Sequence, residues 1–198
     1  KPSKLLSAGF FVSGQSNFNT KSDVLKVAVN SLTSDVDTSV YVQDNPGTGI
    51  MPGAWGFGLM YRHAADFRVG IDYQANKWSL YENEARPYTM MDSWKIAAGG
   101  AWIPDANSIT SYFKRVEYRA GFYTKMDPRV IDGTQVSESA FTFGAAFPFI
   151  VQRNVAWLQF GFDVGNRTGG DQLNDNFVRG NVGFIFNDNA WFIKSKYE

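Results

Sequence analysis

The most constraining feature of this sequence is a repeated alternation of apolar residues with polar or small ones. In residues 55–62, aromatic and aliphatic side chains occupy every second position, and glycine, methionine and arginine occupy the others. Because successive side chains of a β-strand point to opposite faces of a sheet, this pattern predicts strands with one apolar face. The clearest segments are 55–62, 67–74, 116–123, 158–165 and 181–187, and weaker versions occur in 5–12, 24–42, 94–103 and 139–147.

The number and length of these segments suit a single antiparallel β-barrel. They give about eight to ten strands of about ten residues, the length that crosses a bilayer when the strand is tilted. The apolar runs are far shorter than the roughly 18 residues that a transmembrane helix needs. An aromatic fraction of 16% and 19 glycines also suit a barrel with aromatic girdles and curved strands. The predicted fold is all-β, an antiparallel transmembrane β-barrel.

A soluble sandwich or lipocalin-like barrel is the alternative, because its strands alternate too, with the apolar face turned inward. Three observations favour the membrane: strands longer than the roughly five or six residues usual in a sandwich, mid-strand charges that suit a hydrated lumen, and tryptophans near segment ends. The candidates for lumen-facing residues are Arg62, Asp72, Lys95, Glu117, Arg119, Asp163 and Arg179. The candidates for interface aromatics are Trp55, Trp78, Trp94, Trp102 and Trp191.

Two groups of side chains have more than one interpretation. The mid-strand charges either line a substrate path or fill a lumen as pairs, and we favour filling because lumen charges must pair or hydrate in both cases. The phenylalanine-rich segment 141–149 either faces lipid or forms an apolar pocket for an acyl chain. The pocket candidates are Phe141, Phe143, Phe147 and Phe149.

The sequence offers little for catalysis or cofactor binding. His63 is the single histidine, there is no Gly-x-Ser-x-Gly motif, and there is no cysteine. Residues 169–176 gather two aspartates and two asparagines without the spacing of an EF-hand, so we expect a polar hairpin loop there. The 19 basic residues balance the 19 acidic ones, which gives no support to a nucleic-acid partner. We expect neither an enzyme nor a bound cofactor or metal.

The expected connections differ in length. Residues 64–66 form a short turn, whereas 83–92, 104–114 and 127–135 are longer and polar. Short turns on one side and long loops on the other are typical of an outer-membrane barrel, whose long loops are extracellular.

From about residue 50 to residue 187, the order of these features resembles the long-chain fatty-acid transporter family. The segments that carry the resemblance are Pro52–Gly58, Gly70–Gln74, Asp92–Gly99, Trp102–Pro104 and Arg115–Tyr123. The tail, 191–197, is similar to the ends of a branch of that family that includes subunits of outer-membrane machines. The resemblance implies that the chain is the C-terminal portion, about eight to ten strands, of a fourteen-stranded barrel.

Two functions follow from this resemblance. The first is transport of hydrophobic small molecules across the bacterial outer membrane, with outer-membrane lipid and a hydrophobic cargo as partners. The alternative is a non-transporting accessory or scaffold subunit that contacts other outer-membrane proteins in a complex for protein secretion or outer-membrane protein assembly. We expect residues 1–187 to form the barrel portion and 188–198 to form a terminal strand extension or a periplasmic tail.

Overall fold

The computed structural model describes residues 3–29, 36–64, 66–151 and 154–186, which form eleven β-strands and two short 3-10 helices. Among these residues, no helix is long and apolar enough to cross a membrane. In chain order the elements are β1 (Lys4–Ser13), β2 (Ser16–Val29), β3 (Val36–Met51), β4 (Ala54–His63), β5 (Phe67–Asn76), η1 (Trp78–Leu80), β6 (Glu82–Asn83), β7 (Ser93–Trp102), η2 (Tyr112–Arg115), β8 (Glu117–Ile131), β9 (Thr134–Val151), β10 (Asn154–Gly169) and β11 (Leu173–Ile185).

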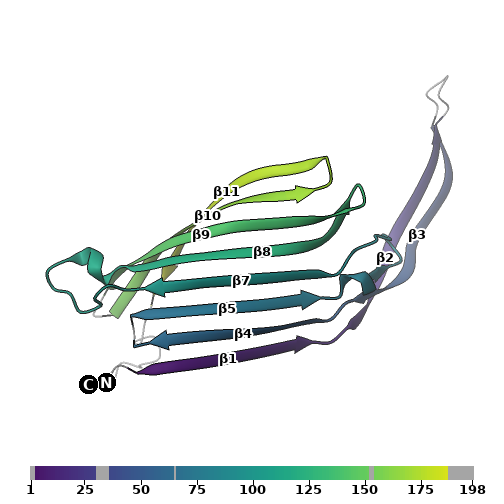
Figure 1. Ribbon diagram of the computed structural model, residues 1–198. Coiled ribbons are helices and arrows are strands. Elements are labelled where there is room, and N and C mark those ends of the chain that lie inside the picture. The colour runs from purple at the N-terminus through teal and green to yellow at the C-terminus, as the bar shows by residue number, and fades with distance from the viewer. Residues whose placement is uncertain (1–2, 30–35, 65, 152–153, 187–198) are drawn as a thin grey trace, which may run out of the picture.

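Eight strands form one sheet in which the strands from β4 onward follow their order in the sequence, and β1 pairs with β4 (Figure 1). Its order is β1-β4-β5-β7-β8-β9-β10-β11, and every pairing is antiparallel. Strands β2, β3 and β6 form a second, three-stranded sheet. The prediction of an all-β, antiparallel fold is therefore confirmed.

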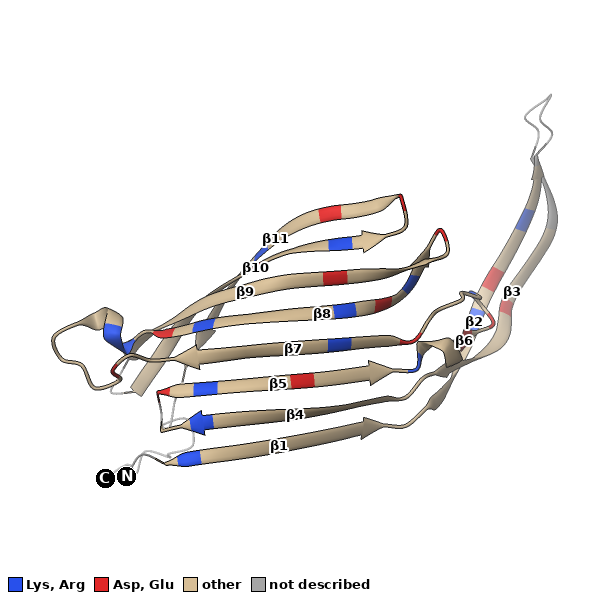
Figure 2. Cartoon of the chain, viewed as in Figure 1, with Lys and Arg blue, Asp and Glu red and all other residues tan. Residues whose placement is uncertain are grey.

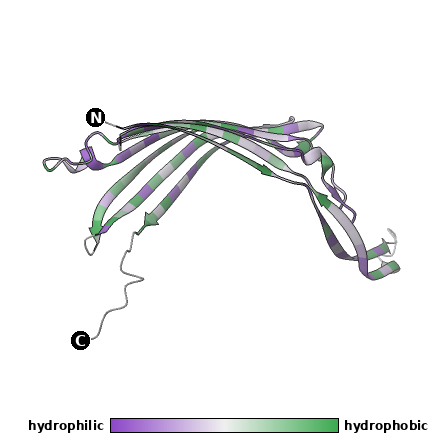
Figure 3. Cartoon of the chain, turned by 90° about the horizontal axis from the view of Figure 1, so that it is seen from below, coloured by the Kyte–Doolittle hydropathy of each residue, from purple (hydrophilic) through white to green (hydrophobic). Residues whose placement is uncertain are grey.

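The eight-stranded sheet curves into an open arch (Figure 3). Within the described residues, the edge strands β1 and β11 each pair with one neighbour only, so their outer backbone groups have no strand beside them. Closing a barrel requires that these edges pair with each other or with further strands. The described strands therefore form an open sheet and do not close into a barrel by themselves, and the transmembrane barrel stays a prediction.

Strands β1 to β4 form one long bent hairpin. The pairing of Ser13 with Ala54 in the first sheet continues as the pairing of Ser16 with Met51 in the second, so the register is unbroken across the bend. The β2–β3 portion projects beyond the arch (Figure 1). Its only other strand contact in the described residues is with the two-residue β6. The hairpin thus has a supported half, β1–β4, and a projecting half, β2–β3.

Three of the predicted loops are wrong in length or position. The polar residues of 127–135 belong mostly to β8 and β9, which are joined by a two-residue turn. That turn, Asp132-Gly133, has positive φ angles of 49° and 76°, which aspartate and glycine tolerate. In 169–176, strand β11 already begins at Leu173.

The long loop 104–114 does not lie opposite the short turn 64–66. Phe67 pairs with Trp102, and the Ile103 amide donates to the Asp66 carbonyl at 2.7 Å, so both connections lie at the same end of the sheet. Loop length therefore does not separate the two ends as the sequence suggested. Polar residues do not distinguish loops from strands in this chain, because the strands themselves carry polar residues on one face.

The distribution of buried side chains is unusual for a soluble domain. The largest fully buried side chains are Glu138, Val116 and Val136. In contrast, Phe10, Val178 and Phe184 are 71%, 74% and 62% exposed. Soluble domains bury large apolar side chains and leave carboxylates in water. In this sheet a carboxylate is among the most buried side chains and many large apolar side chains are exposed, most of them on the face opposite the ion pairs.

Candidate functional site

The register of the sheet places charged side chains from neighbouring strands on one face. Cross-strand partners share a face, and the row Arg62, Arg68, Ala101, Arg119 runs across β4, β5, β7 and β8. Figure 2 shows how the charges spread along these strands. All seven predicted lumen-facing residues fall on this face, which we call the polar face: Arg62, Asp72, Lys95, Glu117, Arg119, Asp163 and Arg179. Whether that face encloses a lumen stays a prediction.

The first cluster on the polar face surrounds Glu138 in β9. Its side chain is 1% exposed. One carboxylate oxygen accepts from the Tyr123 hydroxyl at 2.7 Å, and the other accepts from Arg167 Nε at 2.9 Å and lies 3.2 Å from Lys125 Nζ. Arg179 approaches to 3.7 Å and also lies 3.7 Å from Asp163. A desolvated carboxylate with several charged donors is a strong, directional anchor, and this one joins β8, β9, β10 and β11.

A second cluster surrounds Glu117 at the start of β8. Its Oε1 accepts from both Arg68 and Arg119, each at 2.5 Å. The Arg119 guanidinium also donates to Gln159 Oε1 at 3.4 Å. Ala101 lies between the two arginines in the cross-strand row, and its small side chain leaves room for them to converge. This cluster ties β5, β8 and β10 together at the end of the sheet that carries the 64–66 turn.

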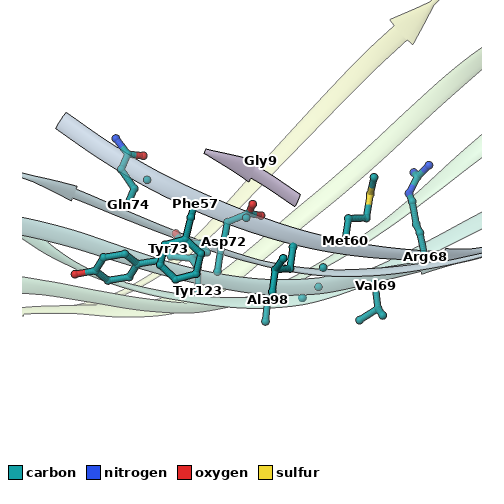
Figure 4. Close-up of a pocket in the computed structure, with 18 of the residues that line it drawn as sticks. Gly9, Phe57, Met60, Arg68, Val69, Asp72, Tyr73, Gln74, Ala98 and Tyr123 are labelled. Carbon is teal, nitrogen blue, oxygen red and sulfur yellow. The ribbon is translucent and has the colours of Figure 1, made fainter. Parts of the chain in front are cut away.

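Between the clusters the polar face is lined by small residues. Gly70, Gly99 and Gly121 are adjacent in register on β5, β7 and β8. They line a hollow of about 1120 Å³ over β1, β4, β5, β7 and β8. Figure 4 shows Asp72, Gln74, Met60 and Arg68 projecting on one side of the sheet and Val69 on the other. The hollow is open, and its lining combines these glycines with charged side chains such as Asp72 and Lys95.

The opposite face, which we call the apolar face, carries the phenylalanines that were candidates for an acyl pocket. Phe141 and Phe143 are 59% and 55% exposed. Phe141 packs on Phe122 with ring centroids 5.0 Å apart, and Phe147 contacts Phe160 at 5.8 Å. Phe149 contacts Phe186. The structure therefore places the four residues on an open face of the sheet, where three of them form separate aromatic pairs, and the acyl pocket stays a prediction.

The predicted interface tryptophans lie near strand ends. Trp55 and Trp94 flank Ala75 in one cross-strand row at one end of the sheet. Trp102 ends β7 at the other end and is 54% exposed. Trp78 lies in η1, directly after β5, and Trp191 lies outside the described residues, as does the predicted tail 188–198.

The described residues show little that would support catalysis. No group of three or more histidine, cysteine, aspartate or glutamate side chains is placed to hold a metal ion in them. His63 pairs in register with Lys4 and Phe67 on the apolar face, away from both carboxylate clusters. The asparagines and the second aspartate of 169–176 belong to β11. The polar face is therefore a set of ion pairs that holds a sheet together.

Sequence reasoning missed the centre of the larger cluster. Glu138, Lys125 and Arg167 are not among the predicted site residues, because they lie just beyond the ends of the predicted strands 116–123, 139–147 and 158–165. The Asp132-Gly133 turn was an available signal, since such a turn sets hairpin register. An ideal hairpin from that turn would have paired Lys125 with Ala140, but a register shift between Met126 and Val130 pairs it with Glu138.

Comparison with known proteins gives one match. No curated protein and no solved structure matches the chain. A family model described as BamG matches residues 3–198, which spans the arch and the projecting hairpin. This match overturns the resemblance to the long-chain fatty-acid transporter family, and with it the expectation that the chain is the C-terminal portion of such a transporter. The chain belongs to the BamG family.

Proposed function

We propose that this protein is a non-enzymatic accessory subunit of an outer-membrane protein assembly complex. The observation that carries the proposal is the BamG family model, which matches the chain over residues 3–198. The family is related to the assembly complex, and this relation favours a structural role over the transport of a hydrophobic cargo. The partners in this proposal are other outer-membrane proteins.

The apolar face supports a location within the outer membrane. In β7, Trp94 and Trp102 lie at the two ends of the strand, about 26 Å apart at about 3.3 Å per residue, close to the roughly 25 Å apolar band of outer-membrane barrels. Between the two ends β7 exposes Ile96, and the neighbouring strands expose Val69 and Phe122 on the same face. The ion pairs lie on the other face, where they would be shielded from lipid.

The unpaired backbone groups at the two edges of the sheet constrain how such a subunit would lie in the membrane. In hydrocarbon, unpaired backbone N–H and C=O groups each cost several kcal/mol, about the value of a lost hydrogen bond in an apolar medium. Strand β1 is uncharged from Leu5 to Val12, and it exposes Leu5 and Phe11 on one face and Leu6 and Phe10 on the other. A strand of this kind is suited to a covered position. We therefore propose that β1 and β11 pair with further strands in the membrane.

The projecting half of the hairpin, β2–β3, is the proposed contact with a partner protein. Leu25 and Tyr41 pair in register and are 60% and 57% exposed. Val27 and Val42 are also largely exposed. A two-stranded ribbon alone is only marginally stable in water, and exposed apolar side chains on it favour a protein surface as its neighbour.

The test is co-purification of the full-length protein from membranes in mild detergent, with a variant that shortens the hairpin. Replacing residues 23–44 by Asn-Gly keeps the Ser22–Asn45 pair and closes the strands with a favoured two-residue turn. We expect the wild type to bring down outer-membrane assembly proteins in stoichiometric amounts, and the shortened variant to recover at least about tenfold less of them.

A matched control is the double substitution Lys21→Gln and Asp44→Asn, which removes an exposed ion pair from the same hairpin without removing its apolar side chains. This control should retain the partners. A wild-type protein that is purified alone would contradict the proposed function. Equal partner recovery by the shortened variant would contradict only the role of the hairpin.

A further inference from the structure

Three arginines lie in one row at the end of the polar face that carries the 64–66 turn, and two of them share the carboxylate of Glu117. Arg62 and Arg68 are directly opposite each other on β4 and β5, and Arg119 follows in the same row beyond Ala101. Arg68 and Arg119 both use Oε1 of Glu117. In the described part of the chain, Arg62 has no carboxylate within 4.0 Å. Like charges directly opposite on neighbouring strands are destabilising.

The charges around these arginines leave a positive excess. Glu117 is 8% exposed and is already occupied by two guanidinium groups. Asp66, at the turn, is the other carboxylate near the row, and in the described residues it forms no ion pair with the three arginines. Lys4 and His63 lie on the apolar face of their strands and so do not belong to the row. The row therefore has unused guanidinium donors.

A small cavity lies at these donors. It has a volume of about 170 Å³ and is lined by Arg62, Asp66, Phe67, Arg68, Ala101 and Glu117. A water molecule takes about 30 Å³, so the cavity has room for a tetrahedral oxoanion with a few waters. Arg62 is exposed and the side chain of Arg68 is 40% exposed, so solvent can reach both arginines that line the cavity.

We propose that Arg62 and Arg68 bind a phosphate group in this cavity, from inorganic phosphate or from a phospholipid headgroup. Guanidinium forks match phosphate oxygens in pairs, and a tetrahedral group can accept from two forks that approach from different strands. The anion would relieve the repulsion between Arg62 and Arg68 and leave the contact of Arg68 with Glu117 in place. Asp66 would oppose binding, because it places a second negative charge at the cavity.

The experiment uses the full-length protein in mild non-ionic detergent, in chloride buffer of constant ionic strength. Inorganic phosphate is titrated by calorimetry, and the unfolding temperature is measured with and without it. The variants are Arg62→Gln, Asp66→Asn and, as a matched control, Arg86→Gln, which removes an exposed arginine from the connection between β6 and β7. Circular dichroism checks that each variant keeps its β-sheet.

We expect saturable phosphate binding that R62Q weakens at least about tenfold, that D66N strengthens a few-fold, and that R86Q leaves unchanged. Without phosphate, R62Q should melt at a higher temperature than the wild type, because the like-charge pair is gone. No saturable binding by the wild type, or equal loss in R62Q and R86Q, would overturn the proposal. If R62Q does not fold, an unchanged affinity in D66N would overturn it.

A second arm identifies the source of the phosphate. Detergent micelles containing phosphatidylglycerol are compared with micelles containing the same amount of diacylglycerol, which has no phosphate. Competition with inorganic phosphate by the first lipid alone would assign the site to a headgroup. Competition by neither would assign it to the free anion. Competition by both would show displacement by the acyl chains and would contradict a phosphate site.

Discussion

The bent hairpin of β1 to β4 belongs to two sheets, and its two halves differ in how they are held. The supported half, β1–β4, is part of an eight-stranded sheet whose far strands are joined by the buried carboxylate of Glu138. The projecting half, β2–β3, has an exposed ion pair, Lys21 with Asp44, whose side chains are 75% and 78% exposed. The supported half continues through β4 into a sheet that two buried carboxylates tie together across several strands, whereas the projecting half meets only β6 among the described strands. We therefore expect the eight-stranded sheet to be the more rigid of the two regions.

The largest effect should come from Glu138→Gln, which tests this contrast directly. The substitution keeps the shape of the side chain but leaves Lys125, Arg167 and Arg179 around a neutral amide. Breaking a buried charge cluster by removing one partner costs about 3–5 kcal/mol. We expect a loss of that size in the free energy of unfolding, measured by urea titration in detergent micelles.

Asp44→Asn is the matched substitution in the projecting half. An exposed pair contributes about 0–1 kcal/mol, so D44N should barely move the urea midpoint. Equal effects of E138Q and D44N would show that the buried cluster is no more important than a surface pair, and the contrast would be lost.

Ala101→Leu should have the next largest effect. The larger side chain would occupy the space in which Arg68 and Arg119 converge on Glu117. Overpacking typically costs about 1–3 kcal/mol. Unfolding by urea measures the loss, and Ala98→Leu on the apolar face of the same strand is the control, since Ala98 is exposed there. A smaller loss in A101L than in A98L would contradict the role given to Ala101.

Much of the fold could be predicted from the alternation in sequence, because period 2 directly reports which side chains share a face. This was enough to group Arg62, Asp72, Lys95 and Glu117 on one face of a sheet. It was not enough to find Glu138 as the centre of a cluster, because its partners depend on register, and a shift between Met126 and Val130 sets that register. The sequence also could not predict that the sheet is open, because apolar and polar residues alternate in the same way in open and closed sheets.

A smaller effect should follow from Glu84→Ala, which removes the brace of the projecting half. The Glu84 carboxylate accepts from the Thr48 amide at 2.5 Å, and the Glu84 amide donates to the Thr48 carbonyl at 3.0 Å. Loss of one such hydrogen bond costs about 1 kcal/mol. We expect faster hydrogen exchange at Thr48 and its neighbours in β3, and unchanged exchange in β8. Slower exchange in both strands, or faster exchange in β8 alone, would contradict this division of the molecule.

The smallest effect is expected when the pH is lowered. It affects the connection between β5 and β7, which contains β6 and so pairs with β3. The hydroxyl of Ser79, with the Ser79 amide at 3.0 Å, lowers the pKa of Asp92 below its usual value of 3.8. Because the pKa in the folded protein is lower than in the unfolded chain, the charged carboxylate stabilises the connection above the unfolded pKa. That contribution is lost as the pH falls through the folded pKa.

Between about pH 5 and pH 3, hydrogen exchange of the amides of 77–83, corrected for its intrinsic dependence on pH, should rise relative to β8 in the wild type. In Asp92→Asn it should be raised at both pH values, because the amide cannot supply the charge. If the wild type and D92N show the same pH dependence, then Asp92 does not hold the connection, and the support of the projecting half comes from Glu84 and β6 alone.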